Sequence, residues 1–120
     1  MLLVICTDWI IILTSGEVEM EFQEMNISKQ KFGNTDMQIT PIGFGAWALG
    51  GGNWVYSWGP QDDQESIDAI YHAMDLGINW IDTAAGYGFG HSEEVIGKAL
   101  HGIKDRPYVF TKCSLTWNDK

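Results

Sequence analysis

Short apolar runs alternate with amphipathic segments along most of this chain. The runs at residues 42–49, 78–83 and 108–112 have the length and composition of buried strands. Between them, two segments carry apolar side chains at helical spacing: Ile67, Ile70, Tyr71 and Met74 in the first, and Val95, Ile96, Ala99 and Leu100 in the second. This order predicts a β-α-β-α-β arrangement, an α/β fold whose parallel strands are covered by helices.

Polar residues and glycines mark where the two helices begin and end. Asp62, with Glu65 three residues later, is the expected N-cap of the first helix. Gly77 is placed to end that helix, because glycine readily adopts the left-handed conformation found there. Ser92 is the expected cap of the second helix, and Gly102 its end.

Two further short strands precede this unit. Residues 27–32 and 37–42 have strand character, and the turn-forming sequence at 33–36 joins them. Such a pattern predicts a β-hairpin.

The first residues differ from the rest. Residues 2–13 are apolar except for Thr7 and Asp8, yet the run is too short to span a bilayer as a helix. No Lys or Arg occurs before Lys29, which argues against a secretory signal. A weak membrane anchor is one interpretation. We expect instead a non-native or disordered extension over residues 1–25, and a folded domain over 26–120.

Composition narrows the class of partner. The chain has 120 residues, 45% of them hydrophobic, and a formal net charge of -9. That charge argues against nucleic acid and anionic membranes as partners, because both bind basic patches. Cys6 and Cys113 match no disulfide or metal spacing, so we expect free thiols, no metal and a cytoplasmic location.

Three side chains that can handle protons fall where predicted strands end. Asp82 closes the strand at 78–83, Tyr87 lies in the glycine-rich turn after it, and Lys112 closes the strand at 108–112. Parallel strands present their carboxyl ends at one edge, so the three side chains should meet. An ammonium favours the phenolate form of a neighbouring phenol, which suits a proton donor. The trio therefore indicates a carbonyl-reducing enzyme.

Each of these residues also has a structural interpretation. Asp82 could stabilise a turn through local hydrogen bonds, and Tyr87 could be a packed aromatic side chain. Either residue alone would be weak support for catalysis. The joint placement with Lys112 favours the functional interpretation.

Glycines and aromatic residues surround the first loop. Residues 43–48 match the GxGxxA pattern of dinucleotide-binding folds, but no helix follows directly, so we reject that interpretation. Gly45 is better explained as room for a ligand or a neighbouring strand. The side chains of the loop could equally plug the structure or wall a substrate site; they are Trp47, Trp54, Tyr56 and Trp58. His91 is expected as an exposed loop residue.

At these residues the chain resembles the aldo-keto reductase family. The matching pieces are residues 42–47, 77–88, 92–100 and 111–112, and the similarity extends over about residues 27–120. The amino-acid sequence of the second loop is most similar to that of the bacterial stress-type branch. The resemblance implies the N-terminal third of a (β/α)₈ TIM barrel, preceded by a β-hairpin that closes its floor.

The resemblance also implies a function. Members bind NADPH and transfer hydride to an aldehyde or ketone. Tyr87 would be the general acid, tuned by Lys112 and Asp82, while Gly45, Ala46, Trp47 and Asp82 would contact the cofactor. The family's catalytic histidine follows a fourth strand, and its later strands hold the adenosine phosphate.

Three other interpretations remain open from the sequence. The barrel could be a non-catalytic NADPH-binding relative, as in potassium-channel subunits. It could be another parallel-barrel enzyme in which residues 50–52 hold a phosphate. The 120 residues could also be inactive on their own.

Overall fold

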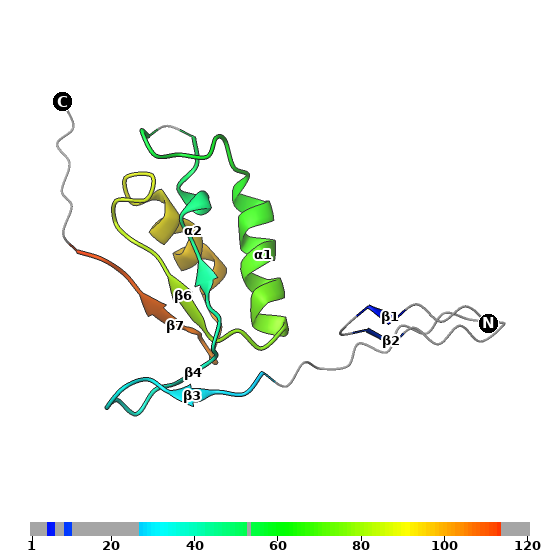
Figure 1. Cartoon of the computed structure of the whole chain (residues 1–120). Coiled ribbons are helices and arrows are strands. Elements are labelled where there is room, and N and C mark those ends of the chain that lie inside the picture. Colours follow the sequence, from blue (N-terminus) through cyan, green and yellow to red (C-terminus); the bar gives the residue numbers. More distant parts are fainter. Residues whose placement is uncertain (1–4, 7–8, 11–26, 53, 114–120) are drawn as a thin grey trace.

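A three-stranded parallel sheet organises the chain (Figure 1). The computed structural model describes residues 5–6, 9–10, 27–52 and 54–113. The sheet has the order β5 (Phe44–Gly45), β6 (Trp80–Asp82) and β7 (Tyr108–Phe110). Helix α1 (Asp63–Asp75) connects β5 to β6, and α2 (His91–Ala99) connects β6 to β7. The predicted parallel β-α-β-α-β order is thus confirmed.

The core lies between the sheet and the two helices. Ile81 projects from the middle of β6 into a buried cluster with Ile70 of α1 and Val95 of α2. Side chains alternate along a strand, so Trp80 and Asp82 point to the opposite face. Burial of each large aliphatic side chain contributes roughly 1.5–3 kcal/mol. The helices therefore fix the sheet from behind and leave the other face for Asp82.

The first strand is much shorter than predicted. The apolar run at 42–49 forms a strand only over β5, and a 3₁₀ turn, η1 (Ala48–Gly50), follows it. Leu49 is buried in the core behind the sheet, and its amide donates to the Ala46 carbonyl at 3.2 Å. Ala46 and Leu49 are buried, whereas Ile42 is 58% exposed, so the prediction of one long buried strand is wrong.

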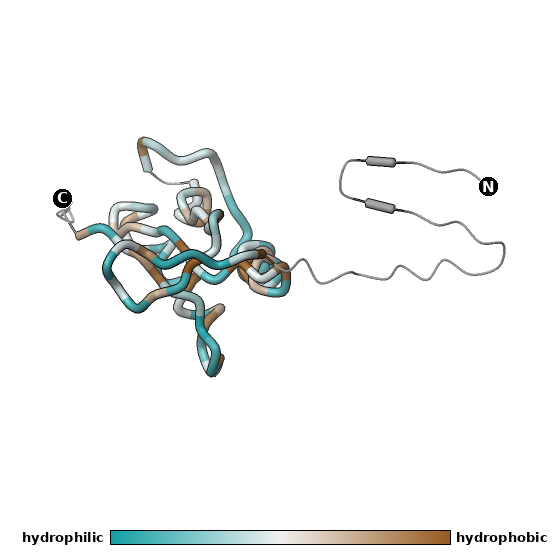
Figure 2. The backbone as a smooth tube through the Cα atoms, turned by 60° about the horizontal axis from the view of Figure 1, so that its bottom comes forward, coloured by the Kyte–Doolittle hydropathy of each residue, from teal (hydrophilic) through white to brown (hydrophobic). Residues whose placement is uncertain are grey.

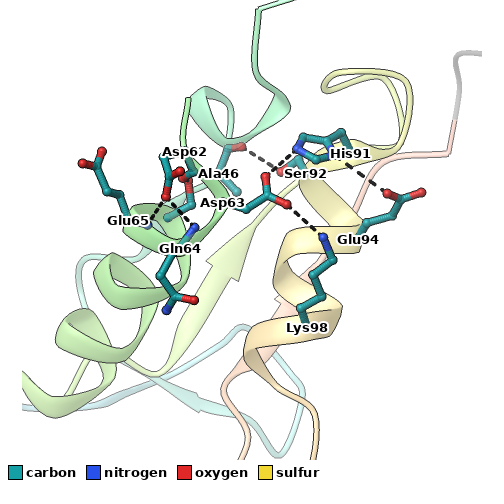
Figure 3. Close-up of polar contacts among 10 residues, drawn as sticks. Ala46, Asp62, Asp63, Gln64, Glu65, His91, Ser92, Glu94 and Lys98 are labelled. Carbon is teal, nitrogen blue, oxygen red and sulfur yellow. Dashed lines mark hydrogen bonds and ion pairs between the residues drawn. The ribbon is translucent and has the colours of Figure 1, made fainter. Parts of the chain in front are cut away.

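The predicted cap of α1 is confirmed. The Asp62 carboxylate accepts hydrogen bonds from the amides of Gln64 and Glu65 at 2.8 and 3.0 Å (Figure 3). Of the apolar face expected for this helix, Ile70 is buried, and Ile67 and Met74 pack partly against the core. Tyr71 lies outside it with 39% exposure.

The predicted cap of α2 is wrong. Gly90 occupies the N-cap position with φ 97°, a conformation that glycine tolerates, and the helix begins at His91. Ser92 lies inside the first turn and is fully buried. Its hydroxyl donates to the Ala46 carbonyl at 2.8 Å and lies 3.0 Å from the Thr83 hydroxyl. Because Ser92 has one hydroxyl hydrogen, Thr83 must donate to it.

A polar link joins the two helices. Asp63, the first residue of α1, contacts His91 and Lys98 of α2 (Figure 3). Its carboxylate oxygens lie 2.8 Å from His91 Nε2 and 2.9 Å from Lys98 Nζ. The expectation that His91 is a loop residue is corrected, because it is helical and half-buried at this link.

The predicted hairpin is confirmed. Strand β3 (Gln30–Lys31) pairs antiparallel with β4 (Gln38–Ile39). Asn79, just before β6, donates to the Gln38 carbonyl at 2.7 Å and accepts from the Thr40 amide at 2.9 Å. The hairpin therefore lies at the amino ends of the parallel strands, away from Lys112.

In the N-terminal extension the structure describes only β1 (Ile5–Cys6) and β2 (Trp9–Ile10), which pair antiparallel. The remaining positions of the predicted extension lie outside the described residues.

Hydrophobic and hydrophilic stretches alternate along the described backbone (Figure 2). Within the part of the chain that the structure describes, no helix is long and apolar enough to cross a membrane.

Replacing Ser92 by Ala should lower the free energy of unfolding by about 1–3 kcal/mol, because it leaves the buried Thr83 hydroxyl without an acceptor. Urea unfolding followed by circular dichroism measures the loss. Ser57→Ala is the matched control, since the Ser57 hydroxyl makes its 3.2 Å bond to the Gly52 carbonyl at the surface. Equal losses in both variants would contradict the structural role of Ser92.

Asp63→Asn should make the stability less sensitive to acid. The hydrogen bond from Lys98, with that from His91, lowers the pKa of Asp63 below its usual 3.8. A lowered pKa means that the carboxylate contributes stability above pH 4 and loses it as the pH falls through the folded-state value. Urea unfolding at pH 7 and pH 3 should therefore show a smaller difference in D63N than in the original chain. Asp68→Asn on the same helix should keep the original difference.

Candidate active site

The parallel register brings three strand ends to one level. Gly45 pairs with Asp82, and Asp82 pairs with Phe110. Lys112 follows two residues beyond Phe110, so its amine can reach back over the end of β6. Tyr87 arrives by a tight turn in which its amide donates to the Ala84 carbonyl at 3.0 Å. The predicted trio of Asp82, Tyr87 and Lys112 does come together.

The ammonium of Lys112 is the centre of this group. Its Nζ donates to both carboxylate oxygens of Asp82 at 2.7 Å and to the Thr83 carbonyl at 3.1 Å. It also lies 3.3 Å from the Tyr87 hydroxyl oxygen and 5.3 Å from the centre of the Tyr87 ring. Three N–H groups thus serve four acceptors, and the bond to Tyr87 is the longest.

These contacts keep Lys112 protonated. The hydrogen bond to Asp82 is the largest cause that raises the pKa of Lys112 above its usual 10.5, and the Tyr87 hydroxyl adds to it. Partial burial acts in the opposite direction and is outweighed. At neutral pH the site therefore presents a positive charge to the Tyr87 oxygen.

Aromatic side chains wall a cavity of about 310 Å³ next to this charge. The ring of Trp47 packs on Tyr87 with centroids 5.1 Å apart, and Trp54 stacks on Tyr87 at 6.2 Å. Tyr56 completes the wall by packing edge-on against Trp54 at 5.9 Å. Lys112 also lines this cavity, so an apolar wall and a proton-handling group meet in one place.

Two residues singled out in the sequence behave differently. Trp58 is 81% exposed and does not line the cavity. A Cβ built on Gly45 would meet no atom of the described residues within 4 Å, so the neighbouring strand does not require glycine there. Room for a ligand remains the predicted reason for Gly45.

A second cavity, of about 390 Å³, lies beside the first. Its wall includes residues 50–52, Gly88 and His91, and it shares Trp54 with the aromatic cavity. The described residues contain no group of three or more His, Cys, Asp or Glu side chains that could hold a metal ion. Cys113, next to Lys112, is a free and exposed thiol as predicted; the same prediction for Cys6 stays untested.

Sequence reasoning missed several contributors to the site. Ala84 and Gly86 line the aromatic cavity, and the Thr83 carbonyl binds Lys112. The sequence predicts Ser92 as a cap, although it continues the apolar stripe of α2 at positions 92, 95, 96 and 99. That spacing is a signal for burial that could have identified it.

The arrangement suits proton transfer beside a planar ligand. An aromatic wall, open space over Gly45 and a phenol next to an ammonium fit a nicotinamide ring and a small carbonyl compound. The described residues are thus compatible with the nicotinamide cofactor that the family resemblance implies.

Comparison with known proteins gives the family. The sequence model of the aldo/keto reductase family matches residues 41–120. The aldo-keto reductase YhdN of Bacillus subtilis is 43% identical over 88 residues, which cover 72% of this chain and 25% of that protein. The NADH-specific methylglyoxal reductase of Escherichia coli is 43% identical over 96 residues, covering 78% and 28%.

More distant relatives include proteins of other functions. One, named "Putative voltage-gated potassium channel subunit beta", comes from Schizosaccharomyces pombe. It is 35% identical over 92 residues, which cover 75% of this chain and 25% of that protein. The curated relatives above are matched over only about a quarter of their length.

Solved structures agree with this placement. The glycerol dehydrogenase of Gluconobacter oxydans superposes with a TM-score of 0.65 at 38% identity, covering 80% of this chain and 28% of that one. A Klebsiella pneumoniae aldo-keto reductase in complex with NADPH gives 0.54 at 32% identity, covering 63% and 24%. The described α/β unit corresponds to part of the barrel fold of these enzymes. This chain belongs to the aldo/keto reductase family.

Proposed function

We propose that the protein containing this chain reduces aldehydes or ketones to alcohols with NADPH. The observation that carries the proposal is the placement of Lys112 Nζ, which bonds Asp82 on one side and lies 3.3 Å from the Tyr87 hydroxyl on the other. A phenol beside a fixed ammonium is an effective proton donor.

Tyr87 is the proposed general acid. Tyr87 lines the aromatic cavity, and its hydroxyl would donate a proton to the carbonyl oxygen of a substrate held there. Lys112 would stabilise the phenolate that remains, because its positive charge is already in place before the proton leaves. Asp82 would orient Lys112 through its two 2.7 Å bonds.

Gly45, Trp47 and Asp82 are the proposed contacts for the nicotinamide end of the cofactor. They lie at the carboxyl ends of β5 and β6, where the open space over Gly45 adjoins the Asp82 carboxylate. The predicted contact at Ala46 is corrected, because Ala46 is fully buried in the core and its amide and carbonyl are bonded to Asp82 and Ser92. When bound, the reduced nicotinamide supplies the hydride for carbonyl reduction. The relatives support a nicotinamide cofactor of either kind, since one is named NADH-specific and another was solved with NADPH.

The substrate class follows from the cavity. About 310 Å³ of space walled by Trp47, Trp54 and Tyr56 accommodates a small carbonyl compound with an apolar part. The name of the E. coli relative suggests methylglyoxal as a first substrate to test. We also propose that the enzyme is cytoplasmic and needs no metal ion.

A non-catalytic role is the second candidate. The likeness to a channel beta subunit shows that the family's sequence pattern also occurs in a protein named for another task. A protein of that kind would bind NADPH and fail to reduce reactive aldehydes.

Tyr87→Phe should lower kcat for methylglyoxal reduction by about 10²- to 10⁴-fold, because it removes the proton donor. Loss of NADPH absorbance at 340 nm in the complete gene product measures the rate, and fluorescence titration measures NADPH binding, which should persist. Tyr71→Phe is the control, since Tyr71 lies on the outer surface of α1. Unchanged turnover in Y87F would refute the proposed role.

A chimaera tests this segment separately from the rest of the barrel. Residues 27–113 would replace the matching segment of the B. subtilis relative, which supplies the remaining strands. An active chimaera that loses turnover on Tyr87→Phe would support the reductase. A folded chimaera that binds NADPH but reduces no aldehyde would favour the non-catalytic role.

Asp82→Asn should move the alkaline limb of the kcat/KM profile to lower pH. Asp82 is the main cause of the raised pKa of Lys112, so removing its charge lets the ammonium deprotonate at lower pH. As the pH rises, kcat/KM of D82N should therefore fall at a lower pH than kcat/KM of the original protein. Asp105→Asn, at an exposed position, should leave the limb in place. An identical limb in D82N and the original protein would contradict the role of Asp82.

A further inference from the structure

Two glycines, one at the end of η1 and one directly after Tyr87, are in close backbone contact. A Cβ on Gly50 would lie 2.7 Å from the Gly88 nitrogen and 2.8 Å from the Tyr87 carbonyl carbon. In the other direction, a Cβ on Gly88 would overlap the carbonyl group of Gly50. All of these are backbone atoms, so no flexible side chain could move aside.

This contact joins the two segments that build the aromatic cavity. Gly50 ends η1, and its amide donates to the Trp47 carbonyl at 3.2 Å. Gly88 directly follows Tyr87 in the sequence. The Trp47 and Tyr87 rings, 5.1 Å apart, thus belong to two backbone segments that touch at Gly50 and Gly88.

The Tyr87 turn is held firmly on its other sides. The Tyr87 amide donates to Ala84, the Tyr87 carbonyl accepts from the Ser92 amide at 3.3 Å, and the Gly88 carbonyl accepts from the His91 amide at 3.2 Å. A methyl group inserted between Gly50 and Gly88 could be accommodated only if the peptide after Tyr87 or the η1 turn moved. Either movement displaces one ring relative to the other.

The contact between Tyr87 and Lys112 is sensitive to such a displacement. At 3.3 Å it is already long for a hydrogen bond between nitrogen and oxygen, whereas the bonds from Lys112 to Asp82 are 2.7 Å. A shift of a few tenths of an ångström at Tyr87 would leave Lys112 bound to Asp82 and lose the phenol.

We propose that Gly50 and Gly88 are positioning residues for the acid Tyr87. Because they lack side chains, the turn that carries Tyr87 lies close enough to η1 to bring the Tyr87 hydroxyl within reach of Lys112. This inference rests on the proposed reductase function. Gly50 is the more informative of the two, because Gly88 also has a φ of +62° that disfavours other residues, whereas Gly50 has no positive φ. Alanine at Gly50 therefore tests the contact alone.

Gly50→Ala in the complete gene product should lower kcat/KM for methylglyoxal by about 10- to 100-fold, as expected for a misplaced reacting group. Gly97→Ala is the matched control, since a Cβ on Gly97 of α2 meets open space. It should retain the original kcat/KM, and circular dichroism should show both variants folded.

A double-mutant cycle separates positioning from general damage. If Gly50 acts by placing Tyr87 against Lys112, the loss caused by Gly50→Ala should largely disappear in a Lys112→Met background. An equal fold-loss in both backgrounds would overturn the inference, as would an unaffected G50A.

Crystal structures of the variants provide a readout independent of turnover. The distance from Tyr87 Oη to Lys112 Nζ should exceed 3.5 Å in G50A and stay near 3.3 Å in G97A. If the original protein reduces no carbonyl compound, the proposed function fails while this distance still decides the positioning role. An unchanged distance in G50A would overturn the inference whatever the activity. If K112M is too slow to assay, this distance takes the place of the double-mutant cycle.

Discussion

The ion pair between Lys112 and Asp82 is the interaction on which the site depends. It forms because the parallel register places the end of β6 level with the end of β7, so that the lysine reaches both carboxylate oxygens at 2.7 Å. A shift of one residue would turn the Asp82 side chain to the helix face and bury its charge in the apolar core. The helices exclude that register, because Ile81 must face Ile70 and Val95. Core packing thereby fixes the electrostatics of the opposite face.

A second polar layer supports the strand ends from behind. Thr83 and Ser92 are almost completely buried, and their hydroxyl bond ties the end of β6 to the start of α2. Ser92 also reaches the Ala46 carbonyl, beyond the end of β5. Buried hydroxyl groups are normally paired, so this network favours the observed contacts among β6, α2 and the segment after β5. The exposed charges of Asp82 and Lys112 therefore lie next to a buried hydrogen-bond network, and this network also holds the surrounding segments together.

Sequence patterns predicted the order of elements, the hairpin and the meeting of Asp82, Tyr87 and Lys112. These depend on local periodicity and on the rule that parallel strands present their ends together. The same patterns did not reveal the end of β5, because an apolar run has the same composition in a strand and in a core-filling turn. They also missed the Gly50 and Gly88 contact and the Asp63 link. Each joins residues far apart in the sequence, and only the tertiary fold brings them together.

The degree of exposure determines what the trio can accomplish. The side chains of Lys112 and Asp82 are 51% and 42% exposed, so water weakens the field that Lys112 exerts on the Tyr87 oxygen. The aromatic side chains Trp47, Trp54 and Tyr56 line the cavity beside this ion pair. A planar cofactor over Gly45 and a substrate against the aromatic wall would exclude much of the remaining water. Because a charge acts more strongly where water is excluded, Lys112 would stabilise the phenolate most when both ligands are bound. Ligand binding and proton transfer would then be coupled through the solvent, without any rearrangement of the fold.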